Sequence, residues 1–61
     1  MDISRVKFNL DNKVKYKGVY YLFTACILRR RNNEDYYQVE LTAIEAKSSL
    51  VIADLKDVEE I

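Results

Sequence analysis

The chain has 61 residues, of which 49% are apolar and 33% are charged, and its ten basic and ten acidic side chains give a formal net charge of zero. A chain of this length buries too little surface to build a second domain or an enclosed substrate cavity. Its apolar content is that of a globular protein, and its balanced charge provides no overall field to attract nucleic acid or an anionic membrane. We therefore expect one small domain over residues 1–61 whose electrostatic interactions are local.

The cysteine and histidine content limits the chemistry of the chain. Cys26 is the only cysteine and there is no histidine, so an internal disulfide and a zinc site are both excluded, and Cys26 is expected to be a small buried apolar side chain. The N-terminal residues lack the basic-then-apolar pattern of a signal peptide, and no apolar run reaches the ~20 residues of a membrane span. These features predict a cytoplasmic protein without a metal or cofactor.

Residues 3–10 are predicted to form a short, half-buried strand. Val6, Phe8 and Leu10 alternate with polar side chains, which is the pattern of a strand with one face on the core. Asp11 and Asn12 follow, and both side chains favour turns because they bond to their own backbone. We expect the chain to reverse there.

Residues 13–16 alternate again and lead to the only glycine of the chain. Val14 and Tyr16 alternate with lysines, and Lys17-Gly18 follows. Gly18 is expected at a positive φ in a two-residue hairpin turn, because glycine adopts this conformation without steric cost. This turn would pair residues 13–16 with the start of the next segment.

The longest apolar segment, residues 19–31, reads VYYLFTACILRRR and contains no Gly, Pro, Asn or Asp. As one strand it would be roughly 40 Å long, which a small domain cannot keep flat. Its smallest side chains lie at residues 24–26, where we expect a bend. The segment would then contribute to two hairpins on two sides of a small closed sheet.

The remaining segments predict two further strands and a helical turn. A polar turn at residues 32–35 (NNED) joins the long strand to a strand at residues 36–42, and residues 43–49 form a connection with at most one helical turn. Residues 50–53 are β-rich. In the tail, Leu55, Val58 and Ile61 are spaced to point inward from a short helical turn, capped by Asp54, and a closing strand.

The segments VKYKGVYY, NNED, YYQVEL and SLVIADLKDVEEI together resemble a small SH3-like barrel. The resemblance covers residues 13–61 and implies an all-β fold, a meander of five or six antiparallel strands with at most one short helical turn. The chain has no Trp and no ALYDY-like segment, so the resemblance does not extend to the polyproline groove of signalling SH3 domains. Short chains of this appearance are familiar from bacterial and mobile-element genomes, which is an analogy only.

Five tyrosines form the first candidate site. Neighbouring residues of a strand face opposite ways, so the pairs Tyr20-Tyr21 and Tyr36-Tyr37 should each place one ring in the core. One interpretation is an exposed aromatic patch of Tyr16, Tyr20 and Tyr36 that binds a protein partner or a second copy. The other is cross-strand ring packing that only stabilises the sheet.

The run Arg29, Arg30 and Arg31 forms the second candidate site. Together with lysines, among them Lys13, Lys15 and Lys17, it would bind the phosphate backbone of a nucleic acid while exposed tyrosines stack on bases. The alternative is a solvated hairpin end, its charge offset by Glu34, Asp35 and Glu40 close by in sequence. The mixed charge favours the solvated end.

Catalysis and cation binding have weaker support. Asp54, Asp57, Glu59 and Glu60 match no calcium loop and indicate an acidic surface. The chain has no histidine, no nucleophile motif and no Gly-rich phosphate loop. We expect a non-catalytic interaction module that binds a protein or itself through tyrosine and aliphatic surface. Nucleic-acid binding is the alternative, and a structural subunit that adds an edge strand to an assembly is a third.

Overall fold

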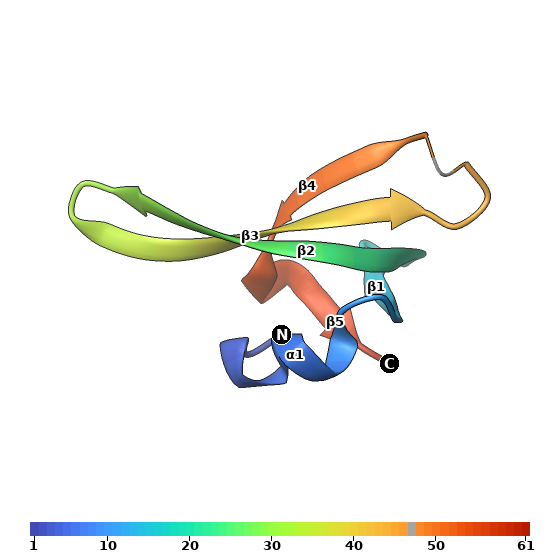
Figure 1. Ribbon diagram of the computed structural model, residues 1–61, viewed down its shortest axis with the longest axis horizontal. Helices are drawn as coiled ribbons and strands as arrows, with labels where there is room; N and C mark the ends of the chain where they lie inside the picture. The colour runs from blue at the N-terminus through green and yellow to red at the C-terminus, as the bar shows by residue number, and fades with distance from the viewer. Residues whose placement is uncertain (47) are drawn as a thin grey trace.

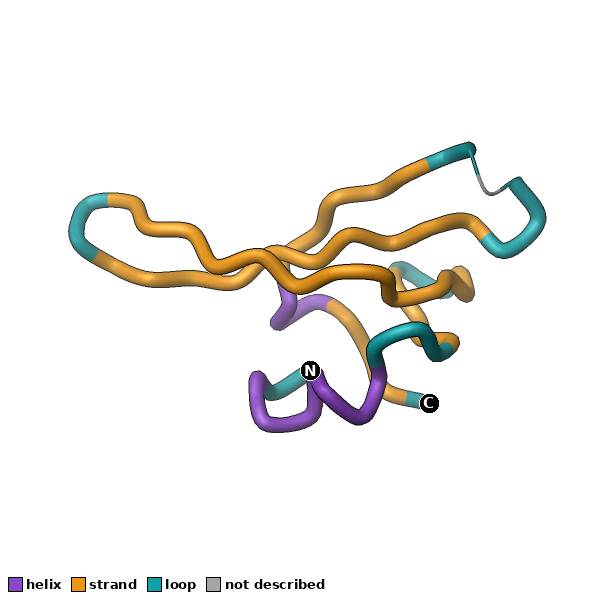
Figure 2. Tube along the Cα trace, in the orientation of Figure 1, coloured by secondary structure: helices purple, strands orange, loops and turns teal. Residues whose placement is uncertain are grey.

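The computed structural model describes residues 1–46 and 48–61 (Figures 1 and 2). The elements in chain order are η1 (Ile3–Arg5), α1 (Val6–Asn9), β1 (Lys13–Tyr16), β2 (Val19–Arg31), β3 (Glu34–Ala43), β4 (Leu50–Asp54), η2 (Leu55–Asp57) and β5 (Val58–Glu60), where η denotes a 3₁₀ turn. The strands form one antiparallel sheet in the order β4-β3-β2-β1-β5. This confirms the predicted all-β class.

A two-residue turn joins β1 to β2. Tyr16 pairs with Val19, and the residues between them, Lys17 and Gly18, have φ angles of 49° and 77°. Two successive positive φ angles define the hairpin turn whose twist matches that of the flanking strands. The predicted role of Gly18 is confirmed.

β2 belongs to two hairpins, as its length predicted. Its first residues, Val19 to Leu22, pair with β1, and residues from Tyr21 to Arg31 pair with β3. The register shifts between Phe23 and Ala25, so that Thr24 is an extra residue in a β-bulge. The bend expected at residues 24–26 is therefore confirmed.

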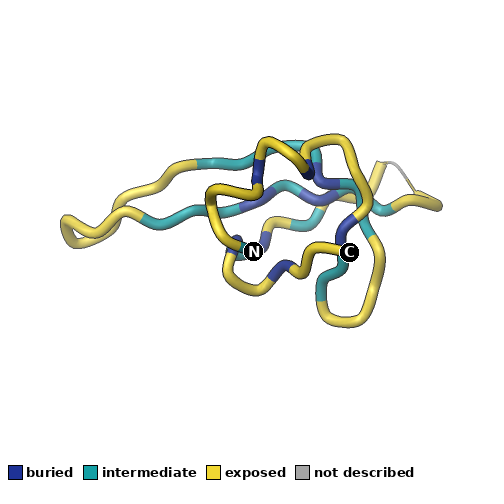
Figure 3. The backbone as a smooth tube through the Cα atoms, turned by 90° about the horizontal axis from the view of Figure 1, so that it is seen from below, coloured by how far each residue is buried: buried dark blue, intermediate teal, exposed yellow. Residues whose placement is uncertain are grey.

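The far half of the β2–β3 hairpin extends beyond the rest of the sheet (Figures 1 and 3). Its turn consists of Asn32 and Asn33 alone, with φ angles of 52° and 65°. The turn is shorter than the predicted NNED tip, since Glu34 and Asp35 already belong to β3. β4 pairs with β3 only from residue 38 onward, so residues 28–37 form a two-stranded arm.

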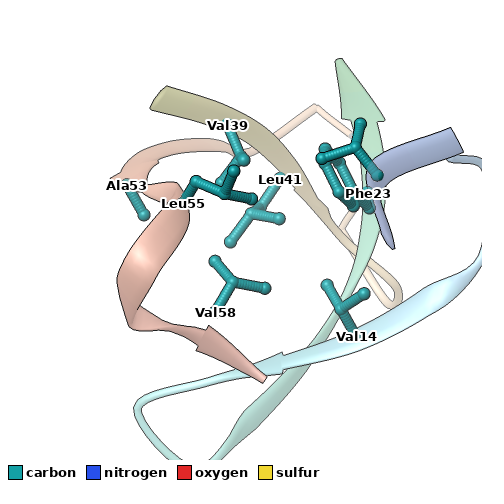
Figure 4. Close-up of a cluster of buried hydrophobic side chains, with 8 residues drawn as sticks. Val14, Phe23, Val39, Leu41, Ala53, Leu55 and Val58 are labelled. Carbon is teal, nitrogen blue, oxygen red and sulfur yellow. The ribbon is translucent and has the colours of Figure 1, made fainter. Parts of the chain in front are cut away.

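The core lies on one face of the sheet, which we call the inner face (Figure 4). Its members come from every strand and from α1 and η2: Val6, Val14, Phe23, Val39, Leu41, Ala53, Leu55 and Val58. Figure 3 shows these buried positions gathered in the middle of the molecule, whereas the arm is exposed or half-buried. The cluster is small, as expected for a chain of this length.

The predicted N-terminal strand is wrong, because residues 3–9 are helical. Asp2 caps η1 by accepting hydrogen bonds from the backbone N–H of Ser4, at 3.2 Å, and from the Ser4 hydroxyl. Val6 and Asn9, three residues apart, are buried, whereas Phe8 is exposed. The helical period thus prevails over the apparent alternation. The reversal predicted at Asp11 is confirmed: its φ is 66° and its N–H donates to the Phe23 carbonyl.

The C-terminal segment forms a 3₁₀ turn followed by a short strand, as predicted. Leu55 and Val58 are buried, but Ile61 is 69% exposed because β5 ends before it, which corrects the inward placement predicted for that residue. Asp54 precedes η2 without a side-chain capping bond. β5 pairs with β1 and lies beside the N-terminus, where the Met1 ammonium donates to the Leu55 and Val58 carbonyls.

The connection between β3 and β4 consists of bends and a turn at residues 44–46 and 48–49. Ser49 donates a backbone hydrogen bond to the Ala46 carbonyl at 2.8 Å. Residues 44–46 and 48–49 contain no helical turn, and position 47 of the predicted connection lies outside the described residues.

Candidate protein-interaction surface

The sheet has a second face, which we call the outer face, opposite the core. Cross-strand partners share a face, so the registers of β2 on β3 and of β3 on β4 define three outer stripes, one on each strand. Between residues 22 and 27 the β2 stripe is apolar and half-buried, with Leu22, Ala25 and Ile27. The β3 stripe carries Tyr36, Gln38, Glu40 and Thr42, and the β4 stripe carries Leu50, Ile52 and Asp54. Two apolar stripes therefore flank a largely polar one.

The β4 stripe is the most exposed apolar part of this face. The Leu50 and Ile52 side chains are 58% and 50% exposed. They lie at one end of the strand order, beside Thr42 and Glu40 of β3. Since each side chain is already about half buried, covering the rest is favourable by roughly half of the 1.5–3 kcal/mol of full burial, so the stripe is suited to protein contact.

No strand formed by residues 1–46 and 48–61 pairs with the outer edge of β4. The Ala43 N–H donates to the Ser49 carbonyl at 3.2 Å, which fixes the phase of the antiparallel β3–β4 ladder. Because hydrogen-bonded pairs alternate with non-bonded ones, Val51 and Ala53 bond to β3. The N–H and C=O groups of Leu50 and Ile52 therefore point away from β3, toward the free edge.

The three tyrosines predicted to form one patch lie apart. Tyr16 is on the inner face, where its ring is 6.3 Å from that of Tyr21, and both pack against the core. Tyr20 is on the outer face beside Lys15, and Tyr36 is on the arm opposite Arg29. Tyr20 is near the start of β2 and Tyr36 lies beside its far end, so most of the length of β2 separates the two rings. Tyr20 and Tyr21 do face opposite ways, as predicted.

Two lysines occupy the surroundings of Tyr20. The Nζ atoms of Lys13 and Lys15 lie 5.4 and 5.7 Å from the centre of its ring. The Nζ atom of Lys17 likewise lies 5.4 Å from the centre of the Tyr16 ring. Cation–π contacts of this kind hold the lysine side chains over the rings, so Tyr20 is part of a local cluster with the β1 lysines.

The arginine run is divided between the two faces of the arm. Arg29 and Arg31 are on the outer face, whereas Arg30 is on the inner face and forms an ion pair with Asp35 at 2.8 Å. Lys15 and Lys17 lie on or beside β1, which pairs with the other end of β2. The basic residues proposed for phosphate binding therefore do not form one patch.

A thiol and an open hollow are two further features of the described residues. Cys26 is half-buried against the core, and this burial raises the pKa of its thiol, which keeps it protonated. A hollow of about 740 Å³, open to solvent, lies between η1, η2 and the arm and is lined by residues that include Ile3, Tyr37 and Lys56. Within residues 1–46 and 48–61, no group of three metal-ligating side chains is found.

The importance of β4 was missing from the sequence interpretation. The run Leu50 to Ala53 was identified as a strand, but its place at an edge depends on the order of all five strands. One local signal was available: this run contains no charge and no proline, the two usual protections of an edge strand.

Comparison with protein-family models, curated proteins and solved structures found no match. Among the described residues, none of the helices has the length and apolar character required to cross a bilayer. The function therefore has to be inferred from the surfaces of the chain itself.

Proposed function

We propose that the protein is a non-catalytic protein-binding module whose contact surface is β4 with the adjoining outer face. The observation that carries this proposal is the combination of exposed Leu50 and Ile52 side chains with an unpaired backbone edge on the same strand. Interfaces of modules bury apolar side chains at their centre and satisfy polar groups around them. β4 offers both kinds of contact within five residues.

We also propose that the fold is a small SH3-like barrel. Three features support this architecture: β2 is shared by two hairpins, η2 directly precedes the last strand, and β5 pairs with β1. The bulge at Thr24 provides the bend that such a closed sheet requires. Function is nevertheless assigned from the β4 surface, because one fold can carry many functions.

The interaction is tested with the purified chain immobilised on a resin and challenged with native lysate. The variant Ile52→Lys places a charge at the centre of the proposed surface, and Ile61→Lys is the matched control, since Ile61 is 69% exposed and lies beyond β5. We expect proteins captured by the wild-type chain to be lost with Ile52→Lys and retained with Ile61→Lys. Equal capture by both variants would refute the assignment to β4, provided that circular dichroism shows both variants folded.

A further inference from the structure

We infer that the partner of β4 is a second copy of this chain, joined by antiparallel pairing of the two β4 strands about a twofold axis at Ile52. This inference rests on the proposed function, because it names the occupant of the same surface. Antiparallel pairing of two identical strands is an isologous contact, in which each copy contributes the same residues.

Coverage or charge protects the β5 edge and the free edge of β2, and Glu34 and Asp35 add charge to the β3 edge of the arm, whereas β4 carries only Asp54 at its end. At the β5 edge, the Met1 ammonium donates to the Val58 carbonyl at 2.6 Å, and Glu59 and Glu60 add negative charge. At β2, both backbone groups of Phe23 are bonded to residues 11 and 12, and three arginines follow along the arm. Charge and coverage are the usual means of preventing edge pairing.

Charge favours a second copy in antiparallel rather than parallel orientation. The only charge in β4 is Asp54 at its end. Parallel pairing in register would place this carboxylate directly beside its counterpart, whereas antiparallel pairing places it opposite Leu50 and moves the two carboxylates to opposite ends. The net charge of zero also removes long-range repulsion between copies.

The backbone phase selects the register. The backbone N–H and C=O groups of Leu50 and Ile52 point to the free edge. In a pair of β4 strands centred on Ile52, the outward N–H groups of one copy therefore meet the outward C=O groups of the other. In this register Ile52 lies opposite Ile52 of the second copy, and Leu50 lies opposite Asp54. The twofold axis is then perpendicular to the sheet, so the two outer faces become continuous and the exposed apolar stripes adjoin.

Engineered cysteines test the register directly. In a Cys26→Ala background, Ile52→Cys places two thiols across the axis, at a Cα separation of about 5.5 Å, which a disulfide can bridge. Leu50→Cys is the matched control, because Leu50 has the same face and similar exposure, yet the two copies of this residue would be more than about 13 Å apart at ~3.3 Å per residue. We expect a covalent dimer from Ile52→Cys at least tenfold faster than from Leu50→Cys. Equal rates would overturn the inference.

Sedimentation separates backbone pairing from side-chain contact. Ile52→Pro removes the outward N–H, which β3 does not use, whereas Ile52→Thr retains this donor and removes only the apolar side chain. We expect the dimer Kd to rise at least tenfold more with proline than with threonine. A wild-type chain that stays monomeric at high micromolar concentration would overturn the inference that β4 pairs with a second copy. In that case, loss of the lysate partners with Ile52→Lys would still support the proposed function. If Ile52→Pro unfolds, the cysteine pair decides the inference.

Discussion

The Thr24 hydroxyl donates a hydrogen bond to the Glu40 carboxylate, with 2.7 Å between Oγ1 and Oε2, and lies 3.1 Å from the Glu40 carbonyl oxygen. Thr24 is the extra residue of the bulge in β2. The next residue of β2, Ala25, pairs with Glu40 of β3. The side chain of the inserted residue therefore ties the bend of β2 to its partner strand at the place where the ladder is interrupted.

Replacing Thr24 by valine should lower the free energy of unfolding by about 1 kcal/mol, the usual contribution of a hydrogen bond. Valine preserves the branched shape and the strand propensity but cannot donate. The measurement is urea denaturation followed by circular dichroism. Thr24→Ser keeps the hydroxyl and should retain most of the stability. A serine variant as unstable as the valine variant would contradict the role of this bond.

Gly18 should be sensitive to the chirality of its replacement. Its φ is +77°, and a Cβ added there would meet no atom within 4 Å, so the cost of Gly18→Ala comes from backbone strain alone, at about 1–2 kcal/mol. D-alanine favours positive φ and restricts the unfolded chain, so it should stabilise the protein by about 0.4–1 kcal/mol relative to glycine. Thermal unfolding of the three chains, made by synthesis, measures both effects. Equal loss from both enantiomers would show a steric cause.

Phe23 should be required for folding. Its side chain is fully buried in the core, and Phe23→Ala should cost about 3–5 kcal/mol, which is comparable to the whole stability of a domain this small. We expect a largely unfolded chain by near-ultraviolet circular dichroism. Phe8→Ala is the control, because that ring is 56% exposed and should change stability by less than about 0.5 kcal/mol.

Acid should remove the contribution of the pair between Arg5 and Glu60. The Arg5 Nε lies 2.9 and 3.0 Å from the two Glu60 carboxylate oxygens, and this hydrogen bond lowers the pKa of Glu60 below its ordinary value of 4.5. A carboxyl whose pKa is lower in the folded state stabilises above its unfolded pKa, and the effect is lost as the pH falls through the folded pKa. The wild-type chain should therefore exceed Glu60→Gln in Tm at pH 7 and lose this small advantage below pH 4.5.

Melting both proteins from neutral to strongly acidic pH, at low and high salt, provides the measurement. Salt should reduce the advantage at pH 7, because the pair is exposed. Asp2, whose pKa is also lowered by its bonds to Ser4, is common to both proteins and cancels in the comparison. A Tm difference that does not change with pH would contradict the prediction.

Nucleic acid should bind weakly. Arg29 and Arg31 are on one face of the arm, and Arg30 is paired with Asp35 on the other, so the arm presents no continuous basic surface. At physiological salt we expect no saturable binding of labelled DNA or RNA tighter than about 100 µM. Fluorescence anisotropy at low and moderate salt measures this. Tighter binding whose affinity and salt slope fall with Arg31→Ala would restore the phosphate-binding hypothesis.

The features predicted correctly from the sequence depend on local chemistry. Gly18 is the one glycine in the sequence and takes a positive φ at no steric cost, and small side chains mark the bend at Thr24. At the N-terminus, local signals conflicted. The side chains of residues 6–10 alternate as in a strand, but Asp2 caps a helical turn, and the buried residues Val6 and Asn9 have the three-residue spacing of a helix. Three alternating positions are too few to distinguish the two periods.

The proposed interaction surface was harder to predict because it depends on long-range order. Tyr16, Tyr20 and Tyr36 look alike in sequence, but the register of β1 on β2 turns Tyr16 inward, and the length of β2 separates the other two. The edge position of Ile52 requires the full strand order. Such pairings connect residues far apart in the chain, and composition carries no information about them.

The pairing of β5 with β1 has a kinetic consequence. Val14 lies opposite Glu60, so this ladder closes a loop that contains about three quarters of the chain, whereas the β2–β3 hairpin closes through two residues. Loop closure of the first kind is slow compared with hairpin formation, which takes about 1–10 µs. Docking of β5 should therefore limit the refolding rate, and on the ribosome the edge of β1 stays open until β5 has been synthesised.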